Sequence, residues 1–190
     1  VWDSERYGSL SLPADSLCFD ILTQAAAAVG PARRGRSDPL AGLAVRRLIA
    51  TGASQSAIKL TAYLNGVQPL VKLIDGFVPT VNPGFGAGFD DALWIPQSAG
   101  GAQGIRSLMR VSTRLRDDAA AKVIIVSSEA ETLSSYSVRQ PDSDRFRLWE
   151  VAGSAHAPAT LVRRAQAMFA RDGVAIGTPA RPVLNLPASE

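Results

Sequence analysis

The feature that most limits the possible folds is an apolar run followed, after a short turn of small residues, by a helical pattern. Residues 45–50 favour a strand and residues 54–64 favour a helix that ends at Asn65-Gly66, with only Thr51-Gly52-Ala53 between them. Further alternation follows along the chain. Strands are expected at 71–78, 122–126 and 145–151, and helices at 16–29, 105–115 and 158–171. This order predicts an α/β fold with a mostly parallel sheet flanked by helices.

The run Lys122 to Val126 gives the strongest strand signal. After its first residue it is continuously apolar, as a strand buried on both faces requires. Residues 1–14, 30–40 and 172–190 are rich in residues that interrupt regular structure, so we expect them to be irregular.

The composition is that of an ordinary globular protein, with 46% apolar and 19% charged residues among 190. We expect one domain over residues 1–190, in which the Gly- and Pro-rich segment 79–104 forms a lid or lines a pocket. The sequence contains no run of 18 apolar residues, so it predicts no membrane-spanning helix. The net charge is +3, and the arginines that supply most of the positive charge are scattered along the chain. This argues against a nucleic-acid partner.

A metal or cofactor site is not expected. One histidine and one cysteine cannot supply a typical zinc site, and no phosphate-binding glycine motif is present. The cysteine, Cys18, lies among apolar residues of the first helix and is predicted to be a core thiol.

Ser54 stands at the turn between the first strand and its helix, within Gly52-Ala53-Ser54-Gln55-Ser56. A nucleophilic serine is commonly exposed on such a strained turn, where the residues two before and two after it must be small. The backbone N–H of Gln55, at the start of the helix, would donate to a developing oxyanion. The alternative is a common pentapeptide in which Ser56 caps the helix.

The only histidine, His156, lies in a Gly-Ser loop between the last strand and the last helix. A nucleophilic serine needs such a base, and the base needs an acid that orients it. Glu129 and Glu131 follow the strand 122–126, and either could be this acid. We prefer Glu131 because it matches the usual position in the loop after the strand, whereas Glu129 could instead brace the loop.

Other residues are weaker candidates for the site. Asp142 and Asp144 are alternative acids nearer the last strand. Asp75, near a strand end, could shape the floor of the site or belong to a turn. Trp94, with two phenylalanines at 85 and 89, could line an apolar ester pocket or anchor the loop.

These segments resemble the "alpha/beta hydrolase domain" family, an esterase-like branch of the α/β-hydrolase superfamily. The matching segments cover nearly the whole chain: Arg6-Tyr7-Gly8, Leu12-Pro13-Ala14-Asp15, Gly52-Ala53-Ser54-Gln55-Ser56-Ala57, Asp75-Gly76-Phe77, Ser128-Glu129-Ala130-Glu131, Arg139-Gln140-Pro141-Asp142-Ser143-Asp144 and Trp149-Glu150-Val151-Ala152-Gly153-Ser154-Ala155-His156. The resemblance implies an α/β-hydrolase fold with Ser54 as nucleophile and His156 as base. It leaves the acid between Glu129 and Glu131, and it implies no particular substrate.

The sequence departs from that fold at its start, because only one helix and one strand are expected before Ser54. The strands that precede the serine in the superfamily, and the loop that supplies a second oxyanion N–H, are therefore expected to be missing. An unpaired sheet edge would then be available for self-association.

Together these features predict a serine hydrolase that cleaves a small-molecule carboxylic ester through an acyl-enzyme. The alternatives are a weakly active or inactive truncated hydrolase, and an acyltransferase or amidase that uses the same three residues.

Overall fold

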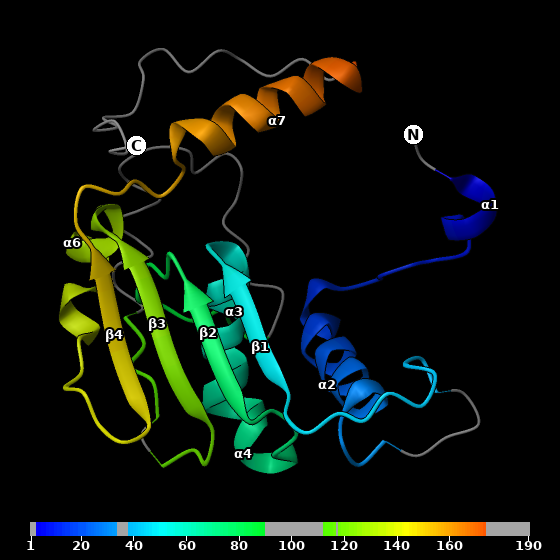
Figure 1. The fold of residues 1–190 in the computed structure, drawn as a ribbon, viewed down its shortest axis with the longest axis horizontal. Coiled ribbons are helices and arrows are strands. Elements are labelled where there is room, and N and C mark those ends of the chain that lie inside the picture. Colours follow the sequence, from blue (N-terminus) through cyan, green and yellow to red (C-terminus); the bar gives the residue numbers. More distant parts are fainter. Residues whose placement is uncertain (1–2, 34–37, 90–111, 117, 174–190) are drawn as a thin grey trace.

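Four parallel strands form one sheet in the computed structural model, which describes residues 3–33, 38–89, 112–116 and 118–173. The strands are β1 (Ile49–Ala53), β2 (Gly76–Thr80), β3 (Lys122–Ser128) and β4 (Phe146–Val151), in the order β1-β2-β3-β4 (Figure 1). All three strand pairs are parallel. The carboxyl ends of the strands therefore lie at one edge of the sheet, and the predicted α/β architecture is confirmed.

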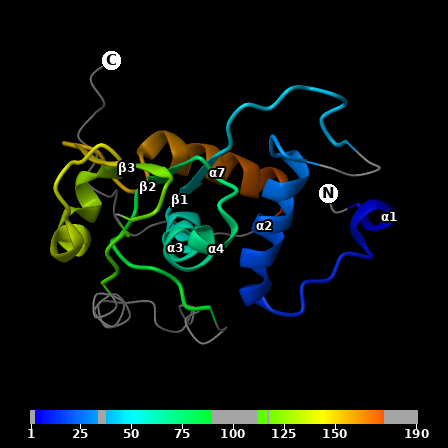
Figure 2. The same ribbon diagram turned by 90° about the horizontal axis from the view of Figure 1, so that it is seen from below.

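The described helices and helical turns are α1 (Ser4–Tyr7), η1 (Asp15–Leu17), α2 (Cys18–Val29), α3 (Gln55–Ala62), η2 (Tyr63–Val67), α4 (Gln68–Val71), η5 (Glu129–Glu131), α6 (Thr132–Ser135), η6 (Tyr136–Val138) and α7 (Ala159–Arg171). Helices α3 and α4 lie against one face of the sheet, and α2 runs beside β1 (Figure 2). Helix α7 lies beyond the carboxyl ends of the strands (Figure 1).

The core lies between the sheet and the helices α2 and α3. Its largest side chains include Tyr63, Leu64 and Phe77, which are almost completely buried. The buried Tyr63 hydroxyl has a hydrogen-bond partner, because it shares a 3.0 Å hydrogen bond with the Thr23 hydroxyl of α2. This packing holds α3, and with it the turn that precedes α3, in a fixed position against the sheet.

The helix after Ser54 is longer than its sequence predicts. It does not end at Asn65-Gly66 but continues as the π-helical turn η2 and then as α4. The glycine here serves packing instead of ending the helix: a Cβ atom at Gly66 would lie 2.3 Å from Phe89 Cζ, so no side chain fits beneath that ring. A packing contact thus explains a glycine that the sequence pattern assigns to a helix end.

Two strand boundaries also differ from expectation. Strand β1 starts at Ile49 and runs through Gly52 to Ala53, and it is not fully buried, since Ile49 is 67% exposed. Strand β2 starts only at Gly76, because α4 extends to Val71 and its C-cap, Lys72, has a left-handed backbone (φ 51°). The first fourteen residues, expected to be irregular, contain the short helix α1. Of the helix predicted at 105–115, residues 112–115 are not helical and the others lie outside the described residues.

Candidate active site

Ser54 lies on a strained turn between β1 and α3, which we call the serine turn (residues 52–56). Its backbone has φ 55° and ψ −115°, a combination that residues with a Cβ atom rarely adopt. Hydrogen bonds on both sides hold it: the Ser54 N–H donates to Thr80 O at 3.0 Å, and Ser54 O accepts from Ile58 N–H at 3.1 Å. Strain that is held in this way is frequent at functional sites.

Small residues make the serine turn possible. A Cβ atom at Gly52 would lie 2.9 Å from Ser56 Cβ and 3.0 Å from the Ser56 carbonyl carbon and oxygen. No ordinary side chain fits at position 52 unless the backbone of α3 moves. The turn therefore depends on the glycine, and it places Ser54 at the carboxyl edge of the sheet.

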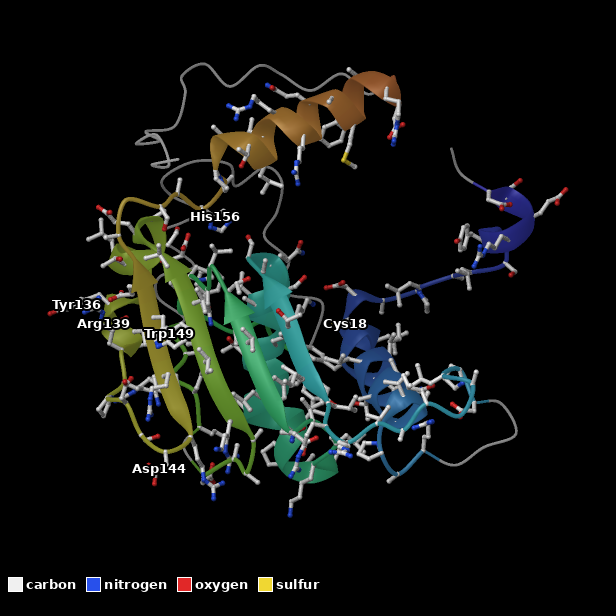
Figure 3. The ribbon with its side chains drawn as sticks, viewed as in Figure 1. Cys18, Tyr136, Arg139, Asp144, Trp149 and His156 are labelled. Carbon is white, nitrogen blue, oxygen red and sulfur yellow. The ribbon has the colours of Figure 1, made fainter. Side chains whose placement is uncertain are left out.

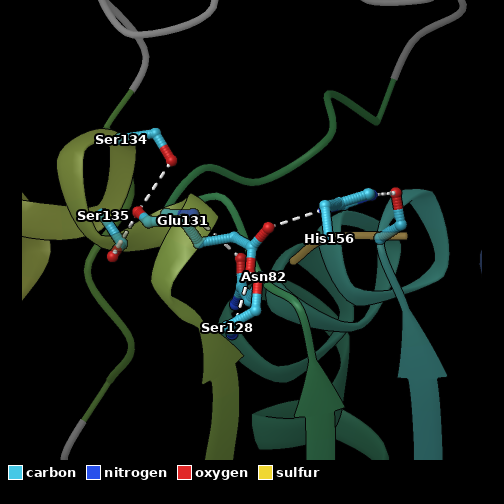
Figure 4. Close-up of polar contacts among 8 residues, drawn as sticks. Asn82, Ser128, Glu131, Ser134, Ser135 and His156 are labelled. Carbon is cyan, nitrogen blue, oxygen red and sulfur yellow. Dashed lines mark hydrogen bonds and ion pairs between the residues drawn. The ribbon is translucent and has the colours of Figure 1, made fainter. Parts of the chain in front are cut away.

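Glu131 is held by a capping box in the turn after β3, which we call the acid turn (residues 128–131). Its Oε2 atom accepts hydrogen bonds from the Ser128 N–H at 2.9 Å and from the Ser128 hydroxyl at 2.6 Å. The side chain is only 4% exposed. The second carboxylate oxygen, Oε1, remains free to face the loop that follows β4 (Figure 4).

His156 lies in that loop, the His156 loop (residues 152–158), above the carboxyl ends of the strands (Figure 3). Its Nδ1 atom lies 2.6 Å from Glu131 Oε1, and its Nε2 atom lies 2.9 Å from Ser54 Oγ. An ionised carboxylate can only accept, so Nδ1 carries the proton and Nε2 accepts from the serine hydroxyl in the neutral ring. The imidazole is 45% exposed, and its orientation rests on these two bonds.

The structure thus brings three of the predicted site residues into one chain of hydrogen bonds. Ser54, Glu131 and His156 follow β1, β3 and β4 respectively, and the serine and histidine are 102 residues apart in sequence. A hydroxyl bonded to an imidazole, which is bonded to a carboxylate, is the arrangement that activates a serine for attack on a carbonyl.

Glu129 lies beside this chain of hydrogen bonds but makes a different contact. Its Oε2 atom accepts a 2.6 Å hydrogen bond from the Gly153 N–H in the His156 loop. The two glutamates, which the sequence left as alternatives, therefore contact different atoms: Glu131 the imidazole and Glu129 the backbone.

The remaining predicted site residues have different locations. The Gln55 N–H lies in the first turn of α3, where a helix has no internal acceptor for it. Asp75, for which the sequence left either a role in the floor of the site or a place in a turn, precedes β2 and therefore lies at the opposite edge of the sheet. There its carboxylate bonds to Arg47 and to the Leu48 N–H. Trp94 lies outside the described residues.

The alternative acids Asp142 and Asp144 precede β4 and therefore lie apart from His156, which follows it. The described part of the 79–104 segment, by contrast, starts beside the site, where Thr80 O accepts from the Ser54 N–H. Asp142 accepts from the Leu148 N–H at 3.4 Å. Phe85 is buried and forms a bridge to Ser112, and the Phe89 ring packs 4.8 Å from that of Phe19. Phe85 thus packs in the core, whereas Phe89 is 54% exposed and packs on Phe19 at its margin. The interpretation that this segment lines an ester pocket stays a prediction. Cys18, the first residue of α2, is partly buried and packs against the hydrophobic core, and it lies well away from His156 (Figure 3).

Ser128 is a residue of this site that the sequence reasoning missed. Ser128-Glu129-Ala130-Glu131 has the S-x-x-E spacing of a capping box, in which the two side chains bond to each other's backbone N–H groups. That spacing distinguishes Glu131 from Glu129, because only the residue three after the serine reaches its backbone.

Within residues 3–33, 38–89, 112–116 and 118–173, no group of three or more His, Cys, Asp or Glu side chains is placed to hold a metal ion. In the same part of the chain, no helix combines the length and apolar character that crossing a membrane requires.

Comparison with known proteins gives a family for this geometry. Residues 1–189 match the family model described as "alpha/beta hydrolase domain". The searches of curated proteins and of solved structures each found no match. With a match over almost its entire length and a parallel sheet of the expected kind, the chain belongs to the alpha/beta hydrolase domain family.

Proposed function

We propose that this protein is a serine hydrolase that cleaves a small-molecule carboxylic ester through an acyl-enzyme. One observation carries the proposal: the continuous hydrogen bonds from Ser54 Oγ to His156 Nε2 and from His156 Nδ1 to Glu131 Oε1. Membership of a hydrolase family supports the general class of reaction. The ester substrate and the roles of the individual residues are our inference from the chemistry of these groups.

In the acylation step, Ser54 Oγ attacks the ester carbonyl carbon while His156 Nε2 takes the hydroxyl proton. The new Oγ–C bond creates a tetrahedral oxyanion, which the Gln55 N–H and the positive end of α3 stabilise. When the intermediate collapses, the bond from carbon to the alkoxy oxygen breaks. The protonated His156 then gives its proton to the departing alcohol.

In the deacylation step, water attacks the acyl-enzyme and His156 takes its proton. The Oγ–C bond then breaks, the proton returns to Ser54, and the carboxylic acid leaves. Glu131 orients the imidazole in both steps and stabilises its charged form.

Labelling with a fluorophosphonate and turnover of p-nitrophenyl esters test this proposal. We expect the folded protein to be labelled at Ser54, and Ser54→Ala to abolish both labelling and turnover. Ser56→Ala is the matched control, since it removes a hydroxyl from the same turn while keeping the Cβ atom that packs against Gly52. Absence of labelling in the folded protein, or labelling that survives Ser54→Ala, would reject the proposal. Product analysis with a primary alcohol or amine present separates hydrolysis from acyl transfer.

A further inference from the structure

The two glutamates of the acid turn divide their contacts between the ring of His156 and the backbone that carries it. Glu131 bonds to the imidazole, whereas Glu129 Oε2 accepts from the Gly153 N–H at 2.6 Å. The second contact joins residues 24 positions apart in sequence and lies three residues before His156. It is a charge-assisted hydrogen bond between exposed groups, so solvent screens part of the added strength that the charge gives.

This contact continues the link between β3 and β4 beyond the end of their ladder. The last paired residues are Ser128 and Val151. Glu129 is the next residue after Ser128, and Gly153 is the second after Val151. Beyond the last backbone pair, the Glu129 side chain therefore continues to link the segment after β3 to the segment after β4.

The His156 loop needs such a support. Gly153 has a left-handed backbone with φ 71°, and residues 151–153 are exposed, so packing does not fix them. The other bond described at the start of this loop is local, from the Ser154 hydroxyl to Val151 O at 2.6 Å. The Glu129 side chain thus ties this part of the loop to the turn that follows β3.

We propose that Glu129 is a positioning residue, which fixes Gly153 and thereby keeps His156 within bonding distance of both Ser54 and Glu131. The inference rests on the proposed function for its effect on catalysis, but not for its effect on the histidine. Glu129 does not act as the orienting acid, because its described bond is to backbone.

The single histidine allows a direct test that needs no activity. In protein labelled with ¹⁵N-histidine and purified without a histidine tag, every imidazole signal comes from His156. The bond to Glu131 should give the Nδ1 proton a slowly exchanging, strongly downfield signal. We expect Glu129→Ala to broaden this signal or speed its exchange, and Glu129→Gln to retain it, because a glutamine oxygen still accepts from Gly153 N–H.

Kinetics on the same variants test the effect on catalysis. We expect Glu129→Ala to lower kcat about 10- to 100-fold with KM unchanged, the range typical for loss of an orienting contact. Glu129→Gln should stay within about threefold of the wild type, since it keeps the acceptor. Glu150→Gln is the matched control: it removes a nearby carboxylate that pairs with Arg139, and it should change neither the signal nor kcat.

Two outcomes would overturn the proposal. Glu129→Ala with a wild-type signal and kcat would show that the contact is dispensable. Loss of activity in Glu129→Gln as severe as in Glu131→Gln would show that Glu129 acts through its charge. If the wild type is not labelled at Ser54 but Glu129→Ala alone disturbs the histidine signal, the proposed function fails and the positioning role stands.

Discussion

At the scale of single residues, the two oxygens of Glu131 serve different purposes. Oε2 is fixed by the N–H and hydroxyl of Ser128, and this leaves Oε1 aimed at His156 Nδ1. A carboxylate suits this position because it accepts at both ends. An amide cannot replace it, since whichever way it turns, its NH₂ group faces a donor.

Glu131→Gln is therefore expected to lower kcat about 10³- to 10⁴-fold, by analogy with the loss that follows when a triad acid becomes an amide. The physical reason is that the amide favours the wrong imidazole tautomer and cannot stabilise the charged ring. Turnover should be measured per folded molecule, with thermal unfolding as the check on stability. A loss smaller than tenfold would argue against Glu131 as the acid.

The substitution Gly52→Ala tests the serine turn by adding a single carbon atom. The new Cβ would lie 2.9–3.0 Å from Ser56 atoms, including backbone, so the start of α3 must shift. We expect a loss of more than tenfold in labelling of Ser54 and a lower melting temperature. Gly76→Ala is the control, because a Cβ there meets its nearest atom at 3.5 Å. Equal behaviour of the two variants would contradict this account of the turn.

At the scale of elements, the acid turn depends on its cap. Ser128→Ala removes one of the two hydrogen bonds that hold Glu131 Oε2, so we expect a loss of about 1 kcal/mol in the free energy of unfolding. Activity should also fall, because Glu131 becomes less well oriented. Urea unfolding and kcat are the two measurements.

The neighbouring serine supplies the matched control. Ser127 Oγ is buried and has no hydrogen-bond partner in the described structure. Removal of an unpaired polar group from the interior costs little, so Ser127→Ala should be neutral or slightly stabilising and leave kcat unchanged. If Ser127→Ala were the more damaging change, the role assigned to the cap would be wrong.

The sequence identifies Ser54, His156 and the pair of glutamates because each follows an element whose pattern is clear. The position after the strand already favours Glu131 over Glu129, and the S-x-x-E spacing of the capping box supports the same choice. The sequence pattern misplaces Asp75, because α4 extends to Val71 and the strand starts only at Gly76, so Asp75 precedes the strand instead of lying within it. Such boundaries depend on tertiary packing, as the Phe89 ring on Gly66 shows.

At the scale of the whole molecule, Asp75 joins the starts of β1 and β2 at the edge opposite the site. The Leu48 N–H and the Arg47 guanidinium lower the pKa of its carboxyl from the ordinary value of 3.8. A carboxyl whose pKa is lowered by folding contributes stability above its unfolded pKa and loses that contribution as the pH falls towards the folded value. We therefore expect Asp75→Asn to be less stable than the wild type near neutral pH, with the difference shrinking below about pH 4. Urea unfolding across this pH range is the measurement, and a difference that grows on acidification would contradict it.

The exposed side of β1 is the surface through which we expect the molecule to meet another chain. In the described structure β1 pairs only with β2, and an apolar groove of about 200 Å³ runs between β1 and α2. Ile49 lines this groove and is 67% exposed. An edge strand beside exposed apolar surface favours pairing with another chain, so we expect self-association that increases with concentration.

Ile49→Lys should weaken this association, because a charged side chain on an edge strand opposes pairing. Leu133→Lys is the matched control, since Leu133 is 87% exposed but lies on α6, after β3, not on the β1 edge. Sedimentation velocity over a range of concentrations would measure both. A shift towards monomer in Ile49→Lys alone supports association through β1. An equal shift in both variants indicates that general surface charge is responsible, and a wild type that stays monomeric at every concentration means that this edge does not pair.

Because β1 leads directly into Ser54, contact at this edge would also bring another chain close to the serine turn, so fluorophosphonate labelling should depend on concentration in the wild type and not in Ile49→Lys.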